Sequence, residues 1–295
     1  MKNNQRRYGR LIAGLIVLAI LILAGCGPGE EAPTETPVTE PAETGTPAAP
    51  TQAPPDGPPR QEAPILTQLS TEDGTLPLPG SALEQTASQV FDIDGDGVMD
   101  IVLGSREGEP SVVWFRPVED GWERYVIDGE ALAIEAGGAY HDIDGDGDLD
   151  LVFGGDFSST RIWWWENPAP DFDPNTPWTR RFIKRGDDRQ HHDLLFADTD
   201  HDGDAEFIFW NQYDDKLMLA EIPADPLDAD TWLYTPIFEG TGEGLDFADI
   251  DGDGLGDLLA GGYWFKYNGL DYDAHVVDVS QDQTRIAAGD LLIGG

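Results

Sequence analysis

The sequence predicts an all-β fold, a propeller of four-stranded antiparallel blades, on the basis of three observations. First, one acidic segment recurs four times, and successive copies are 50, 56 and 51 residues apart. Second, the residues between the copies form short runs rich in β-branched and aromatic side chains, bounded by Gly, Pro and Asp. Third, we find no amphipathic helix of ordinary length after residue 64. A period of about 50 residues is typical of one propeller blade, so we expect about four complete blades and additional partial ones.

Each repeat is expected to contribute four strands that form an antiparallel meander. The first strand precedes the acidic segment, at residues 88–91, 137–141, 194–197 and 245–248. The second strand follows the acidic segment, at residues 101–105, 151–155, 207–211 and 258–262. The third strand is an aromatic or apolar run, at residues 112–115, 162–165, 217–220 and 263–267. The fourth strand has an alternating pattern, at residues 123–128, 179–184, 231–238 and 274–279.

The first 26 residues have the pattern of a secretory signal. Four basic residues and no acid occur among the first ten, and an uncharged run follows at residues 11–25. At ~1.5 Å per residue this run is too short for the ~30 Å core of a bilayer, so a signal fits better than a spanning helix. The run ends at Cys26, the only cysteine, and residues 23–26 resemble the lipobox of bacterial lipoproteins. An uncleaved anchor with an incidental cysteine is the alternative.

The lipobox resemblance implies cleavage before Cys26, attachment of lipid to this residue, and anchoring to the bacterial cell membrane. The protein is then extracytoplasmic, at the cell surface or on the periplasmic face. Residues 27–64 predict a disordered linker, because they hold 11 of the 22 prolines, mixed with Thr, Ala and Glu, and show no apolar period. The propeller is expected over residues 65–295, which contain no cysteine, so a disulfide cannot stabilise it.

The acidic segment has the form D-x-D-x-D-G-x-x-D, which suits a hard cation. Aspartates at positions 1, 3 and 5 of a tight turn point toward one centre, and Gly at position 6 permits the chain reversal. The carbonyl of position 7 and the acid of position 9 complete a set of oxygen ligands, which calcium prefers over zinc or copper. Acidic turns without metal are the alternative. However, four carboxylates in one loop repel one another, and no Lys or Arg is expected nearby.

An EF-hand opens with the same pattern but is excluded. It closes with Glu at position 12, where this sequence has Leu103, Phe153, Phe209 and Ala260. The flanking residues are also expected to be strands rather than helices.

The four copies resemble the FG-GAP/VCBS-type repeats of integrin-like β-propellers, over residues 88 to 295. This resemblance implies a calcium loop between two strands of each blade, and up to four structural calcium ions. Carried onto this sequence, the ligands of the first two loops are Asp92, Asp94, Asp96, Val98, Asp100, Asp142, Asp144, Asp146, Asp148 and Asp150. Those of the last two loops are Asp198, Asp200, Asp202, Asp204, Glu206, Asp249, Asp251, Asp253, Leu255 and Asp257. The third loop departs from the pattern, with His201 in place of Gly and Glu206 in place of Asp.

The tryptophans and two adjacent histidines are further candidates for a site. Most of the nine tryptophans are expected in the core between blades. Alternation along a strand places Trp163 and Trp165 on one face and Trp164 on the other. For the same reason His191 and His192 are not expected to share a site, and a structural role is favoured over one in the propeller channel.

Composition and motifs narrow the function. The net charge of −40 excludes nucleic acid and anionic lipid surfaces as partners. No nucleophile elbow, phosphate loop, zinc-protease motif or dinucleotide fingerprint occurs, so catalysis has no positive support. We therefore expect a binding or adhesion module for glycan or surface protein. A polysaccharide lyase or hydrolase, by analogy of fold alone, and a structural module of a larger surface assembly are the alternatives.

Residues 285–295 resemble the strand that precedes a loop in this family, but no acidic segment follows them. Because family propellers usually have more blades, we expect a truncated reading frame. A small ring of four or five blades and completion by a partner chain are the alternatives.

We predict that Cys26→Ser abolishes lipid attachment, because Cys26 supplies the only thiol. After growth with an alkyne-tagged fatty acid, the wild-type protein should carry the tag and the variant should not. Thr34→Ser in the predicted linker is the matched control and should keep the tag. Equal tagging of the Cys26→Ser variant would disprove the lipoprotein interpretation.

Overall fold

The computed structural model describes residues 68–280 and 285–289 of the chain. The signal predicted at residues 1–26, with Cys26, and the linker predicted at residues 27–64 lie outside the described residues. Within the described part, no helix has the length and apolar character needed to cross a membrane.

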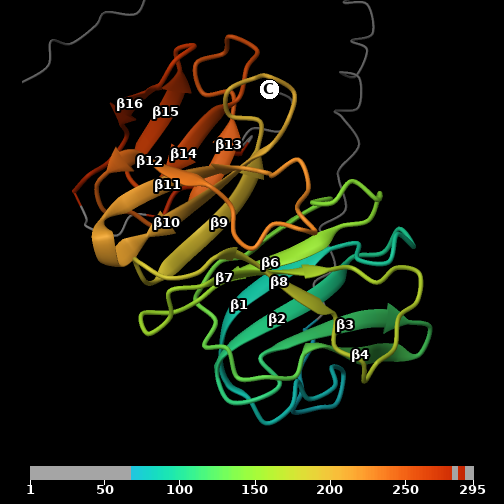
Figure 1. The fold of residues 1–295 in the computed structure, drawn as a ribbon. Coiled ribbons are helices and arrows are strands. Elements are labelled where there is room, and N and C mark those ends of the chain that lie inside the picture. The colour runs from blue at the N-terminus through green and yellow to red at the C-terminus, as the bar shows by residue number, and fades with distance from the viewer. Residues whose placement is uncertain (1–67, 281–284, 290–295) are drawn as a thin grey trace, which may run out of the picture. The chain divides into compact units, whose positions relative to one another are not determined.

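Sixteen strands and one short 3₁₀ helix form the described fold (Figure 1). Blade 1 contains β1 (Leu83–Phe91), β2 (Asp100–Glu107), β3 (Val112–Val118) and β4 (Gly121–Asp128). Blade 2 contains β5 (Ala139–His141), β6 (Asp150–Gly154), β7 (Ile162–Glu166) and β8 (Thr179–Lys184). Blade 3 contains β9 (His191–Ala197), β10 (Glu206–Asn211), the 3₁₀ helix η1 (Gln212–Asp214), β11 (Lys216–Glu221) and β12 (Tyr234–Glu239). Blade 4 contains β13 (Leu245–Ala248), β14 (Asp257–Ala260), β15 (Tyr263–Tyr267) and β16 (Tyr272–Val276).

Each blade is an antiparallel sheet whose strands pair in chain order. In blade 2, Leu151 of β6 lies opposite Tyr140 of β5 and Trp165 of β7. The prediction of an all-β propeller with four-stranded antiparallel blades is confirmed. The differences are at strand ends: β1 begins five residues and β9 three residues earlier than predicted, β12 begins three residues later, and β16 ends at Val276 rather than at residue 279.

The first strands of neighbouring blades lie against one another. β9 of blade 3 contacts β5 and β6 of blade 2 and β13 of blade 4. At the boundary of blades 2 and 3 the Asp193 N–H donates to the Ala136 carbonyl over 3.1 Å. Gly137 permits this approach, because a Cβ there would lie 2.5 Å from Asp193 Cα.

Three apolar clusters fill the boundaries between successive blades. The cluster between blades 1 and 2 includes Trp114, Phe153, Trp163 and Trp165. The cluster between blades 2 and 3 includes Trp164, Phe207, Phe209 and Trp232. The cluster between blades 3 and 4 includes Trp210, Leu258 and Phe265. Burial of these large side chains is the main favourable contribution to packing one blade on the next.

The tryptophan triplet divides between two boundaries, as alternation along the strand predicts. Trp163 and Trp165 belong to the cluster shared with blade 1, and Trp164 belongs to the cluster shared with blade 3. Each of the three is no more than 1% exposed. Seven of the nine tryptophans are buried, so the expectation that most of them form core is confirmed.

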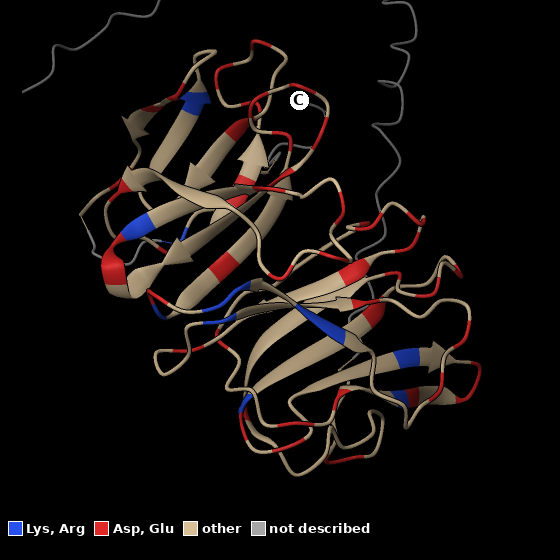
Figure 2. Ribbon diagram, in the orientation of Figure 1, with Lys and Arg blue, Asp and Glu red and all other residues tan. Residues whose placement is uncertain are grey.

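Strand direction gives every blade two ends. The four acidic loops join the first and second strands, and we call this end the acidic end. The hairpins between the second and third strands lie at the opposite end, because paired strands run antiparallel. Figure 2 shows how few Lys and Arg residues accompany the Asp and Glu residues of the described fold.

Residues 285–289 lie beside β13, although no strand is assigned to them. The Ala288 N–H donates to Asp246 Oδ2 over 2.7 Å, and Arg285 Nε lies 3.3 Å from Glu243 Oε2. These contacts resemble those between the first strands of the preceding blades.

Candidate functional site

The four acidic loops have one geometry, set by hydrogen bonds from backbone N–H groups to carboxylates. In each loop the position 1 carboxylate accepts from the N–H of position 6, over 2.9 to 3.2 Å. The position 3 carboxylate accepts from the N–H of position 5, and the position 5 carboxylate accepts from that of position 7. These bonds turn successive acids toward the inside of the loop.

Glycine at position 6 is required by the backbone. Gly97, Gly147, Gly203 and Gly254 have φ between +88° and +104°, a region that other residues rarely adopt. At position 4 the third loop has His201 in the left-handed region, with φ of +66°, where the other loops have glycine. His201 therefore changes the sequence pattern without changing the turn.

The loops bring different subsets of the predicted ligands together. In blades 1 and 2, one oxygen from each acid at positions 1, 3 and 5 lies within 4.8 Å of the others: Asp92, Asp94, Asp96, and Asp142, Asp144, Asp146. In blade 3 the acids of positions 1, 3, 5 and 9 meet this limit: Asp198, Asp200, Asp202 and Glu206. In blade 4 they are Asp249, Asp251 and Asp257. The irregular third loop thus holds the most complete group, and the position 7 carbonyls stay a prediction.

The position 9 acids are buried at the start of each second strand. Asp100 Oδ2 accepts the Ile93 N–H over 2.8 Å, and the same bond recurs in the other three blades. Burial raises the pKa of Asp100 to about 6, that of Glu206 to about 7 and that of Asp150 to about 8. Neighbouring loop carboxylates raise these pKa values further, against the lowering effect of the N–H donors.

The donor set fits calcium. All side-chain ligands are carboxylate oxygens, and in the third loop the buried Oδ1 of Asp198 has no hydrogen-bond partner among the described residues. A buried carboxylate oxygen without a partner is costly, and a cation would offset that cost. The acids of this loop are therefore arranged as a hard cation requires.

Two basic side chains lie against the loops, and the expectation that none is nearby is wrong for blades 1 and 4. Arg116 Nε of β3 lies 2.5 Å from Asp94 Oδ2. Lys266 Nζ of β15 contacts Asp251 Oδ2 and lies 2.5 Å from Asp253 Oδ2. Both come from third strands, which pairing brings beside a loop that is distant in the sequence.

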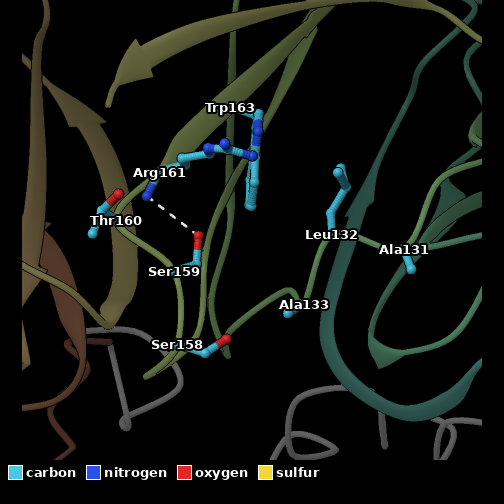
Figure 3. Close-up of a pocket in the computed structure, with 8 residues that line it drawn as sticks. All are labelled: Ala131, Leu132, Ala133, Ser158, Ser159, Thr160, Arg161 and Trp163. Atoms are coloured by element: carbon cyan, nitrogen blue, oxygen red, sulfur yellow. Dashed lines mark hydrogen bonds between the residues drawn. The ribbon is translucent and has the colours of Figure 1, made fainter. Parts of the chain in front are cut away.

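A pocket lies at the opposite end, between blades 1 and 2 (Figure 3). It encloses about 350 Å³ and is lined by Ala131, Leu132, Ala133, Ser158, Ser159, Thr160, Arg161 and Trp163. Leu132 and Trp163 lie on opposite sides of it. The indole N–H of Trp163 is buried in the core and has no hydrogen-bond partner among the described residues.

His191 and His192 have different surroundings, as their adjacency on a strand predicts. His192 Nδ1 lies 2.5 Å from Asp193 Oδ2, and its Nε2 lies 3.9 Å from Glu243 Oε1. Burial opposes protonation of His192, but the hydrogen bond and charge of Asp193 raise its pKa overall. His191 is fully buried edge-on to Phe209, and burial lowers its pKa to about 3.

Comparison with protein-family models matches residues 142–209 to the FG-GAP-like repeat. Those residues form an FG-GAP-like repeat. The match begins at Asp142 and ends at Phe209, so it includes the acidic loops of blades 2 and 3. No curated protein matches the sequence.

Several solved structures are similar in fold. A lectin from Agrocybe aegerita that recognises non-reducing terminal N-acetylglucosamine is 20% identical, with 64% of this chain and 51% of the lectin covered and a TM-score of 0.43. The V. cholerae biofilm matrix protein Bap1 is 18% identical, with 64% and 30% covered and a TM-score of 0.41. The rhamnogalacturonan lyase YesW is 14% identical, with 61% and 40% covered and a TM-score of 0.36. The chain spans about half or less of the length of these proteins.

The FG-GAP-like repeat pattern identifies the loop acids but not the residues that surround them. Arg116 and Lys266 were missed because nothing in the loop sequence indicates which third-strand residue will face it. Strand register carries that information. Leu258 pairs with Phe265, so Lys266 lies opposite Asp257, the first residue of β14. The pocket with Trp163 was missed because it is lined by a hairpin of blade 2 and by the connection between β4 and β5, which are distant in the sequence.

We predict that calcium-free protein loses stability as the pH rises from about 4 to 8. The folded-state pKa values of Asp100, Glu206 and Asp150 lie above the ordinary value of about 4, so each group favours the fold when protonated and this contribution disappears as the pH passes its folded pKa. Urea unfolding in chelator at several pH values measures the effect.

Saturating calcium is the control, because a bound cation stabilises the ionised carboxylates and should flatten the profile. A stability in chelator that increases between pH 5 and 8 would contradict the assignment of raised pKa values to these acids.

Proposed function

We propose that this chain is a calcium-stabilised binding module on a β-propeller scaffold, anchored outside the cytoplasm. The observation that carries the proposal is the shared geometry of the four acidic loops, in which backbone N–H groups orient carboxylates toward one another. Such a geometry concentrates negative charge in a protein whose net charge is already −40. Structural cations offset that repulsion.

The candidate calcium ligands are the acids at positions 1, 3, 5 and 9 of a loop, with the position 7 carbonyl. Calcium would supply positive charge and fix the loop, with no part in chemistry. The Ile at position 2 of the first two loops supports a structural role. Ile93 and Ile143 are buried in the clusters between blades, so each loop is connected directly to a core.

We predict that chelator lowers the melting temperature of the full-length protein in detergent by about 10 °C or more. Two sites, each filled at 100 times its dissociation constant, together add about 5 kcal/mol to the free energy of unfolding. Differential scanning fluorimetry with EGTA and then with excess calcium measures this. Magnesium at the same concentration is the control, since it prefers octahedral sites with several waters and should restore less. Equal melting temperatures with and without calcium would disprove the proposal.

The proposed ligand is a glycan, or a glycan-bearing surface protein, bound in the pocket at the opposite end. Its volume of about 350 Å³ falls within the range of small-ligand sites, about 300 to 1,000 Å³. Arg161 and the hydroxyl group of Ser159 offer donors that suit hydroxyl and carboxylate groups of sugars. An extracytoplasmic anchor and a proline-rich linker would hold such a pocket away from the membrane.

A polysaccharide-degrading enzyme is the second candidate. The buried His192–Asp193 pair beside Glu243 favours it, because these are groups that transfer protons. None of these three residues lines the pocket, and the pair has internal partners, so binding is the function that the geometry supports best.

We predict that Arg161→Ala weakens glycan binding by about tenfold or more, because a hydrogen bond from a charged donor is lost. A glycan array with the full-length protein identifies the ligand, and titration compares the variant with the wild type. Arg185→Ala is the matched control, since Arg185 is exposed and does not line the pocket. The absence of any bound glycan, or release of product from a polysaccharide panel, would contradict the binding proposal.

A further inference from the structure

One position on the third strand differs in charge from blade to blade. Glu221 lies opposite Glu206, the position 9 acid of blade 3. In the other blades, extending the strand pairing by one residue places Arg116, Glu166 and Lys266 opposite the position 9 acid. We call this the facing position. It is basic in blades 1 and 4 and acidic in blades 2 and 3.

The two basic side chains take the same place in their loops. Arg116 lies against Asp94 and Asp96, with its Nη2 3.7 Å from Asp96 Oδ2. Lys266 lies against Asp251 and Asp253, which again are the acids of positions 3 and 5. Each base therefore occupies carboxylates that a metal ion would need.

In blades 2 and 3 the acidic side chain at the facing position adds negative charge beside the loop. In blades 1 and 4 the basic side chain reduces that charge. Glu221 lines a cavity of about 370 Å³ together with Asp202 and Asp204 of its own loop. Glu166 pairs with Arg181, but both hydrogen bonds go to Oε2, over 2.6 and 3.0 Å. Blade 3 therefore has the strongest unbalanced negative charge, and it also contains the unpartnered Oδ1 of Asp198.

We propose that the facing position divides the four loops into two classes, in which blades 2 and 3 bind calcium and blades 1 and 4 hold Arg116 and Lys266 in its place. This inference rests on the proposed function. A base that contacts the acids of positions 3 and 5 competes with calcium for the same oxygens and reduces the charge on which affinity depends. Blades 1 and 4 are then stable without metal, whereas blades 2 and 3 require it.

The test is calcium titration by calorimetry of the full-length protein in detergent after removal of metal. The wild type should show two tight sites. Glu166→Lys and Glu221→Lys should each remove one of them, and Arg116→Gln and Lys266→Gln should each add one by strengthening binding about tenfold or more. The Gln variants remove the positive charge of the side chain without introducing a carboxylate, so the fold need not accommodate a new acid.

Arg185→Gln is the matched control, because Arg185 follows the end of β8 that lies away from the acidic loops. It should leave two sites. Circular dichroism of each variant with excess calcium confirms folding before titration.

The outcomes separate this inference from the proposed function. Absence of calcium binding in the folded wild type would overturn the proposed function and this inference with it. Four equal tight sites in the wild type would leave calcium binding intact and overturn the division into classes. Two tight sites that survive both Glu→Lys changes, or Gln variants that still bind two ions, would also overturn it.

Discussion

The repulsion among the carboxylates of each acidic loop is the constraint on which the described fold depends. In blades 1 and 2 the loop cannot relax this repulsion by opening, because alternate residues serve two purposes. In blade 1, Asp92 and Asp94 face the loop interior while Ile93 between them is 2% exposed in the boundary with blade 2. Opening the loop would withdraw Ile93 from that core. These acids must therefore be neutralised where they are, by protonation, by a basic side chain or by a cation.

This coupling also explains how the two ends of the blades differ. The acidic end carries turns whose backbone N–H groups are directed to their own carboxylates. At the opposite end, the hairpin between Gly154 and Ile162 lines a pocket that includes Arg161 and Trp163. If the pocket binds the proposed ligand, recognition and the acidic loops lie at separate ends of one sheet, so changes in the pocket need not disturb the loops.

The sequence was sufficient for the parts of the structure that are local or periodic. Alternation predicted the separate faces of Trp163, Trp164 and Trp165, and the spacing of the repeats predicted four blades. It was insufficient where two distant segments meet. Lys266 beside Asp251 depends on the register of a hairpin, and the pocket depends on how blade 1 packs on blade 2. The left-handed backbone of His201 shows a further limit, because a departure from the repeat pattern left the turn unchanged.

The tryptophan triplet of β7 has a consequence for folding cooperativity. Three consecutive residues supply large side chains to two separate cores, so blade 2 cannot lose its sheet without exposing both. In an array of repeats, stability is close to a sum of units and their nearest-neighbour interfaces. A blade with large apolar interfaces on both sides makes its neighbours unfold together rather than one at a time. Blade 2 is thus the element through which blades 1 and 3 become one cooperative unit.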